Sequence, residues 1–132
     1  GFHVILGERD ARLAQIAADK PDAVMTTSEA VISGNSDLIA PVLKQAKIPS
    51  IDFNVERGVK SGYMIVYGIS RYSVGLHGAR IVDKVLKGES PGEIPVEFAS
   101  VLTFEINAAL AKEIGVKIPD SLLLRANKVY NQ

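Results

Sequence analysis

Short apolar runs alternate with stretches of helical periodicity along the chain. The runs are rich in strand-favouring residues and are closed by glycine, proline or polar residues. They predict strands at residues 2–6, 23–27, 48–53 and 63–67, and a further strand at 94–98 or 101–106. The polar stretches at residues 28–29, 33–37 and 54–62 predict loops.

Helical spacing of apolar residues predicts helices between these strands. The first has Asp10 as its N-cap and stops at Pro21. In the second, Pro41 marks the first turn or a kink. The longest helix runs from an N-cap at Ser70 to Lys87, just before a glycine suited to end it.

Two shorter helices are predicted in the C-terminal part. Asn107 caps a helix that ends at Gly115. Pro119 begins a last helix, whose Val129 and Tyr130 are predicted to face the core. Strand, helix and strand in alternation predict parallel pairs with right-handed crossovers, and therefore an α/β fold. The length of 132 residues is that of a single domain, residues 1–132.

The composition removes several classes of function. The charges of fifteen basic and fifteen acidic residues cancel, so the chain lacks the net positive charge typical of proteins that bind nucleic acids. It has no cysteine, which excludes disulfides, thiolate metal sites and cysteine nucleophiles. The two histidines, His3 and His77, lie at no metal-ligand spacing. Because no phosphate-binding glycine motif or assembled catalytic set occurs, we expect no cofactor, no metal and no catalysis.

Polar and aromatic residues gather where three predicted strands end. In open parallel sheets, ligands bind beyond the carboxyl ends of the strands. Hydroxyl, carboxylate and amide groups there can hydrogen-bond a small solute, and tyrosine rings can stack on it. The predicted ligand-binding residues are Ser28, Glu29, Asp52, Asn54, Tyr67, Ser70 and Tyr72. The alternative is that the polar residues form turns and helix caps and that the tyrosines belong to the core.

The sequence resembles a known family, most closely from Tyr67 onward. The resemblance rests on residues 67–72 and 81–91, and on a tail that ends in Ile-Pro-x-x-Leu-Leu-x-Arg-Ala at residues 118–126. Upstream, residues 21–24 and 47–49, followed by Val-Glu-Arg-Gly at 55–58, match at the same intervals. These segments are similar to the C-terminal part of ABC-transporter substrate-binding proteins, in the subfamily that includes tryptophan and aromatic amino acid binders.

The resemblance implies a type I periplasmic-binding-protein fold, in which two α/β lobes close on a ligand in the cleft between them. The chain then corresponds to one lobe with a parallel sheet in three layers. The helix at residues 71–88 is expected to pack on the other lobe or on a second copy, as a homodimer. Relatives carry a Thr-Asp-Asn-like triplet where this chain has Ser28-Glu29-Ala30, and an acid at the position of Ser70, which implies a changed ligand.

The resemblance also implies a role in transport and a location. Members deliver a small solute, here amino-acid-like, to the membrane permease of an ABC importer, and they are not enzymes. We expect a periplasmic or extracytoplasmic protein with a signal peptide upstream of Gly1. An extracytoplasmic sensing domain of a signalling protein is the main alternative, and an enzyme of flavodoxin-like shape is a third reading.

Overall fold

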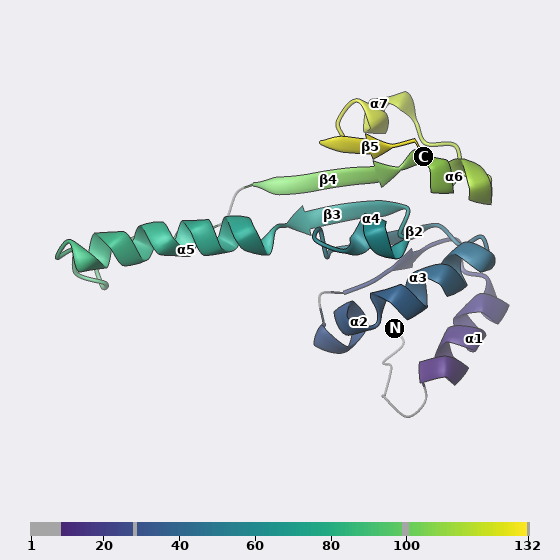
Figure 1. The fold of residues 1–132 in the computed structure, drawn as a ribbon, viewed down its shortest axis with the longest axis horizontal. Coiled ribbons are helices and arrows are strands. Elements are labelled where there is room, and N and C mark those ends of the chain that lie inside the picture. Colours follow the sequence, from purple (N-terminus) through teal and green to yellow (C-terminus); the bar gives the residue numbers. More distant parts are fainter. Residues whose placement is uncertain (1–8, 28, 99–100, 132) are drawn as a thin grey trace.

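The computed structural model describes residues 9–27, 29–98 and 101–131. It shows a mixed α/β fold whose elements lie around one sheet (Figure 1). The elements are α1 (Arg9–Asp19), β1 (Val24–Met25), α2 (Ala30–Gly34), α3 (Ser36–Gln45), β2 (Ser50–Asp52), α4 (Gly58–Ser61), β3 (Ile65–Ile69), α5 (Arg71–Leu86), β4 (Leu102–Asn107), α6 (Ala108–Ile114), α7 (Asp120–Leu123) and β5 (Lys128–Tyr130).

The five strands follow one another across the sheet in chain order, from β1 to β5. β1, β2 and β3 are parallel, as the alternation of strands and helices predicts. β4 runs antiparallel to β3, with Tyr67 opposite Phe104, and β5 is parallel to β4. The sheet is therefore mostly parallel, as expected, and β4 is the exception, because the chain leaves the sheet along α5 and returns in the opposite direction (Figure 1).

Two hydrophobic clusters hold the layers together. The first cluster consists of Ala40 and Leu43 of α3 together with Ile48 and Tyr63, and partly buried residues of α1 and β1 pack against it. Met64 and three residues of α6 form the other. Ile65 packs against the α6 cluster, whereas Val66 faces α4 at Gly58. Since neighbouring strand residues point to opposite faces, the helices cover both faces of the sheet and form three layers.

Local signals placed several helix ends correctly. Ser70 is the N-cap of α5, where its side chain accepts a hydrogen bond from the N–H of Ser73. Asn107 caps α6 in the same way, by accepting from the N–H of Leu110. Gly115 ends α6 in the left-handed conformation, with φ of 83°. These predictions are confirmed.

Other boundaries differ from the prediction. α1 begins at Arg9, so Asp10 lies inside the helix instead of capping it. Pro41 lies inside α3 and not in its first turn, which leaves the alternative of a kink as a prediction. Val129 and Tyr130 belong to β5 and not to the last helix, which is the short α7.

Two predicted loops contain helical residues. Residues 58–61 form α4 inside the loop expected at 54–62, and the loop expected at 33–37 overlaps the end of α2 and the start of α3. The strand before α6 is β4, while residues 94–98 form no strand. The strand predicted at residues 2–6 lies outside the described residues.

The long helix α5 stands apart from the sheet. Figure 1 shows it extending beyond the ends of β3 and β4. None of its residues is buried, and large apolar side chains such as Tyr72, Leu76 and Leu86 are exposed along it. Among the helices of the described residues, none is long and apolar enough to cross a membrane. The exposure of α5 therefore marks an apolar surface that the described part of the chain does not cover.

Candidate functional site

The carboxyl ends of β1, β2 and β3 form one edge of the sheet. These strands are parallel and in register, with Met25 beside Ile51 and Ile51 beside Ile65. The pairing continues one residue past β1, where the N–H of Thr26 donates to the carbonyl oxygen of Ile51 at 3.0 Å. The loops that leave this edge carry most of the residues predicted to bind a ligand.

Asp52 lies beneath this edge and joins two strands. It is only 1% exposed. Its Oδ1 accepts hydrogen bonds from the Thr26 hydroxyl at 2.5 Å and from the N–H of Phe53 at 2.9 Å. Its Oδ2 is buried without a hydrogen-bond partner among the described residues. Asp52 thus ties the end of β1 to the end of β2, and a contact of this carboxylate with a ligand stays a prediction.

Tyr63 completes this buried polar cluster. Its side chain is fully buried in the α3 cluster. Burial raises the pKa of the Tyr63 hydroxyl, and the nearby Asp52 carboxylate raises it further. The hydroxyl therefore stays protonated near neutral pH and is a potential donor beside a carboxylate. Sequence patterns missed both Thr26 and Tyr63, because each reads simply as a strand residue.

Asn54 presents an unused acceptor at the end of β2. Its side chain is 7% exposed, and Oδ1 has no hydrogen-bond partner among the described residues. Its backbone carbonyl accepts from the N–H of Gly58 at 2.7 Å, which starts α4 and fixes the turn. Leaving a buried acceptor unpaired costs free energy that a donor from a bound molecule would recover. Asn54 is therefore the strongest candidate for a ligand contact.

The other predicted polar residues have different roles. Ser70 is committed to capping α5. Glu29 is exposed at the N-cap position of α2, and no side-chain capping bond is formed there. Ser28 lies outside the described residues. Of the two that the structure describes, Ser70 and Glu29, it is Glu29 whose side chain is exposed and free of a capping bond, so that a solute could contact it.

The two tyrosines do not converge on the strand ends. Tyr67 lies in the middle of β3, where its ring packs edge-on against Phe104 with centroids 5.9 Å apart. Its ring therefore belongs to the sheet face, and 40% of the side chain is exposed there. Tyr72 is highly exposed in the first turn of α5. Stacking of either ring on a ligand remains a prediction.

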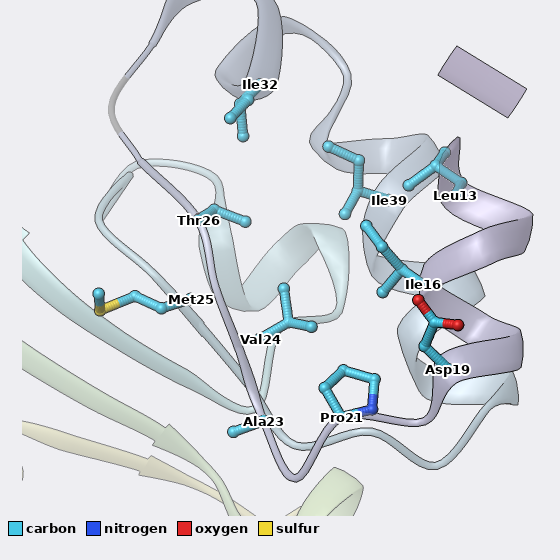
Figure 2. A pocket seen from close by; sticks show the side chains of 10 residues that line it. All are labelled: Leu13, Ile16, Asp19, Pro21, Ala23, Val24, Met25, Thr26, Ile32 and Ile39. Atoms are coloured by element: carbon cyan, nitrogen blue, oxygen red, sulfur yellow. The ribbon is translucent and has the colours of Figure 1, made fainter. Parts of the chain in front are cut away.

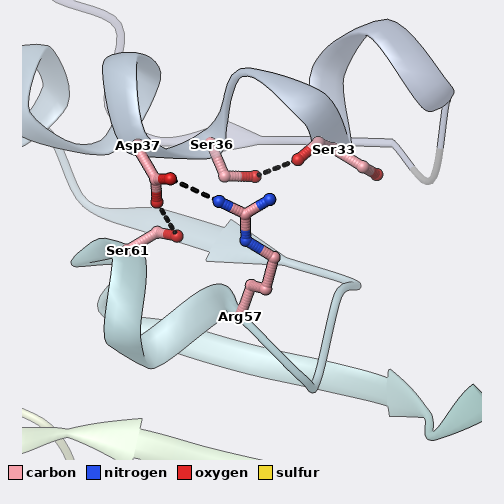
Figure 3. A network of polar contacts seen from close by, with 5 residues as sticks. All are labelled: Ser33, Ser36, Asp37, Arg57 and Ser61. Carbon is pink, nitrogen blue, oxygen red and sulfur yellow. Dashed lines mark hydrogen bonds and ion pairs between the residues drawn. The ribbon is translucent and has the colours of Figure 1, made fainter.

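Arg57 is engaged within the fold. Figure 3 shows its guanidinium paired with the Asp37 carboxylate of α3, while the Ser61 hydroxyl donates to the other oxygen of Asp37 at 2.6 Å. The Ser36 hydroxyl donates to the Ser33 carbonyl oxygen at 3.1 Å. The contacts of Asp37 fasten α4 to α3, and the Ser36 bond joins α3 to α2.

An apolar pocket of about 310 Å³ lies beside β1 (Figure 2). It is lined mainly by side chains of α1, β1, α2 and α3, among them Leu13, Ile16, Val24 and Ile39. Of the described residues that line the pocket, Asp19 alone is charged. A single carboxylate gives no convergent set of polar groups to orient a solute, so the strand-end edge is the better candidate site. Within the described residues there is also no group of three or more potential metal ligands.

The sequence profile of the ABC transporter substrate binding proteins matches residues 10–130, so the chain belongs to this family. The family is a class of binding proteins and not of enzymes, which confirms the resemblance and the expectation of no catalysis. No curated protein gives a significant match to the chain.

Three solved structures are similar to the chain. A conserved domain protein from Vibrio cholerae O1 biovar El Tor is 24% identical, with a TM-score of 0.79 over 93% of this chain. An ABC domain in complex with L-Trp from Streptococcus pneumoniae is also 24% identical, with a TM-score of 0.77 over 93%. A ligand-free, open substrate binding protein with adhesive properties from Clostridium difficile is 18% identical, with a TM-score of 0.68 over 98%.

These likenesses confirm the α/β lobe. The chain spans 41%, 42% and 43% of the lengths of those three proteins, so it corresponds to less than half of each. The matched family is one of substrate-binding proteins of ABC transporters.

Proposed function

We propose that the chain is one lobe of a two-lobed solute-binding protein of an ABC importer. An amino-acid-like solute would bind where β1, β2 and β3 end, in the cleft between the lobes. The observation that carries this proposal is the buried Oδ1 of Asn54 at that edge, which has no hydrogen-bond partner in the described part of the chain. The family and the lobe-like fold support it.

The chemistry of the edge favours a ligand that donates hydrogen bonds. Asn54 offers an amide oxygen and Glu29 an exposed carboxylate, and both groups accept. An ammonium group is a compact cation with three donors, so it suits such acceptors. Asp52 supports the site from below by holding the ends of β1 and β2 together. An amino acid has the required ammonium group, and one similar structure is a complex with L-Trp.

The exposed helix α5 supports the two-lobed arrangement. It has no buried residue, and its apolar side chains need a partner surface. In our proposal residues 71–88 pack on the second lobe. The similar structures are more than twice as long as this chain, so they contain further residues that could form such a lobe. In the isolated chain a second copy takes that place.

The remaining assignments follow from the transport role. The closed lobes would deliver the solute to a membrane permease, by a hinge motion driven by the higher affinity of the closed state. The protein would act in the periplasm or outside the cell, after export by an upstream signal peptide. An extracytoplasmic sensing domain would use the same cleft. A kinase or other signalling domain in the same polypeptide would favour that alternative.

Calorimetric titration with a panel of amino acids, including L-tryptophan, tests the proposal. We expect saturable binding by the two-lobed protein that carries this chain, and at least a tenfold loss of affinity in Asn54→Ala, which corresponds to about 1.4 kcal/mol. Asn131→Ala is the matched control, since that asparagine is exposed near the end of the chain. Absence of binding across the panel would reject an amino-acid solute. Equal affinity of the two variants would reject the site.

A further inference from the structure

Glu56 connects a strand-end loop to α5. Its Oε1 accepts a hydrogen bond of 2.6 Å from the backbone N–H of Arg71, the first residue of α5. Glu56 lies two residues after Asn54, in the segment between β2 and α4. The first N–H groups of a helix have no partner within it, and the helix dipole favours a carboxylate at this end. A residue next to the candidate site therefore supports the start of the exposed helix.

The loop that carries Glu56 is firmly held. The N–H of Phe53 donates to Asp52, and the carbonyl of Asn54 accepts from the N–H of Gly58. The loop also lies close against β3 at Gly68, where an added Cβ would be 2.4 Å from the carbonyl oxygen of Phe53. The absence of a side chain at Gly68 lets the loop approach the end of β3, so that Glu56 reaches Arg71.

Other polar contacts of α5 join the helix to the segment that follows it, and not to the sheet. Arg80 and Lys84 lie near the Glu97 carboxylate, at 3.8 Å and 3.4 Å. Glu97 belongs to the segment that follows α5, so these ion pairs hold that segment to the helix and not the helix to the sheet. α5 has no buried residue, so among the contacts of residues 9–27, 29–98 and 101–131 the junction at Ser70 and the bond to Glu56 are those that orient the helix on the sheet.

We propose that Glu56 is a positioning residue that fixes the angle between α5 and the sheet. The inference rests on the proposed function, in which α5 packs on the second lobe. The angle of α5 then sets how the two lobes face each other across the cleft. Because Asn54 and Glu56 share one short loop, the loop that presents Asn54 also sets the direction of α5 through the Arg71 hydrogen bond.

Distance measurements between spin labels test this without any solute. The chain has no cysteine, so Ala79→Cys on α5 and Lys112→Cys on α6 accept labels at those two positions alone. Double electron–electron resonance on the labelled chain measures the distribution of distances between the two helices, at a dilution where the chain is monomeric. The variants are Glu56→Ala, Glu56→Gln and, as a matched removal of one exposed carboxylate, Glu89→Gln.

We expect Glu56→Ala to widen the distribution and Glu56→Gln to keep it narrow, because the amide oxygen still accepts from Arg71. Glu89→Gln should match the unsubstituted chain. In the same samples, exchange of the Arg71 amide proton should accelerate about fivefold in Glu56→Ala and stay unchanged in Glu56→Gln. Melting curves check that every variant is folded.

Two results would overturn the proposal. One is a distribution in Glu56→Ala as narrow as in the unsubstituted chain, even if the Arg71 amide exchanges faster. The other is a widening of equal size in Glu89→Gln, which would assign the effect to net charge. Since no solute enters these measurements, failure here is distinct from failure of the amino-acid titration.

Discussion

The hydroxyl of Thr26 donates a hydrogen bond of 2.5 Å to Oδ1 of Asp52, and both side chains are buried. The bond joins the ends of β1 and β2, the two strands that lead to Glu29 and Asn54. A buried carboxylate loses its hydration, so its remaining hydrogen bonds matter more than those of a surface residue. This pair therefore sets the geometry of the candidate site from below.

Removing the Thr26 hydroxyl should destabilise the fold. Thr26→Val keeps the shape of the side chain but leaves the Asp52 carboxylate with one fewer donor, which we expect to cost about 1–3 kcal/mol. Thr26→Ser keeps the hydroxyl and is the matched control. Urea denaturation followed by circular dichroism measures the free energy of unfolding. If the valine variant were as stable as the serine variant, the hydrogen bond would contribute nothing.

Tyr63 should make stability depend on alkaline pH. Its pKa is raised in the folded state above the ordinary value of 10.0, by burial first and by Asp52 second. Above pH 10 the unfolded chain releases this proton while the folded chain keeps it, so the unfolded state is favoured increasingly as pH rises. The contribution of the neutral tyrosine is thus complete below pH 10 and is lost above it.

Comparing variants isolates this effect from other titrating groups. Between pH 9 and 11 the unfolding free energy of the unsubstituted chain should fall more steeply than that of Tyr63→Phe. The excess slope approaches about 1.4 kcal/mol per pH unit at the upper end. Tyr72→Phe removes an exposed hydroxyl instead and should follow the unsubstituted chain. Parallel curves for all three proteins would contradict the role of Tyr63.

Helix ends were predictable because their signals are local. Ser70, Asn107 and Gly115 act on residues within three or four positions in the chain, and short sequence patterns capture such contacts. The α/β class followed from periodicity for the same reason. The antiparallel β4 was not predictable this way, since its direction depends on where α5 releases the chain.

The roles of the site residues depend on contacts between distant segments. Asp52 read as a strand-end carboxylate, but its side chain is buried and accepts a hydrogen bond from Thr26, 26 positions earlier in the chain. Nothing local distinguishes a buried carboxylate from an exposed one. The same holds for Glu56, which sequence patterns left without a function and which meets α5 fifteen positions later. Asn54 was correctly placed at the strand end.

Gly68 should not tolerate a side chain. An added Cβ would lie 2.4 Å from the backbone carbonyl oxygen of Phe53, and a backbone atom cannot move aside without shifting the loop. We expect Gly68→Ala to cost about 1–3 kcal/mol of stability. Gly75→Ala is the control, because nothing lies near that position in α5 and alanine favours helix by about 1 kcal/mol. Equal melting temperatures for the two variants would contradict the close approach.

The exposed side chains of α5 should make the isolated chain self-associate. Leu76 and Leu86 are 57% and 81% exposed, and burying them against another surface is favourable. Sedimentation velocity over a wide concentration range should show a dimer that dissociates on dilution. Leu76→Glu combined with Leu86→Glu should weaken association at least tenfold, because each charge would have to be buried in the contact. Leu124→Glu, which alters an equally exposed leucine outside α5, should leave association unchanged. A monomer at all concentrations, or equal weakening by the Leu124 variant, would show that α5 is not the surface that seeks a partner.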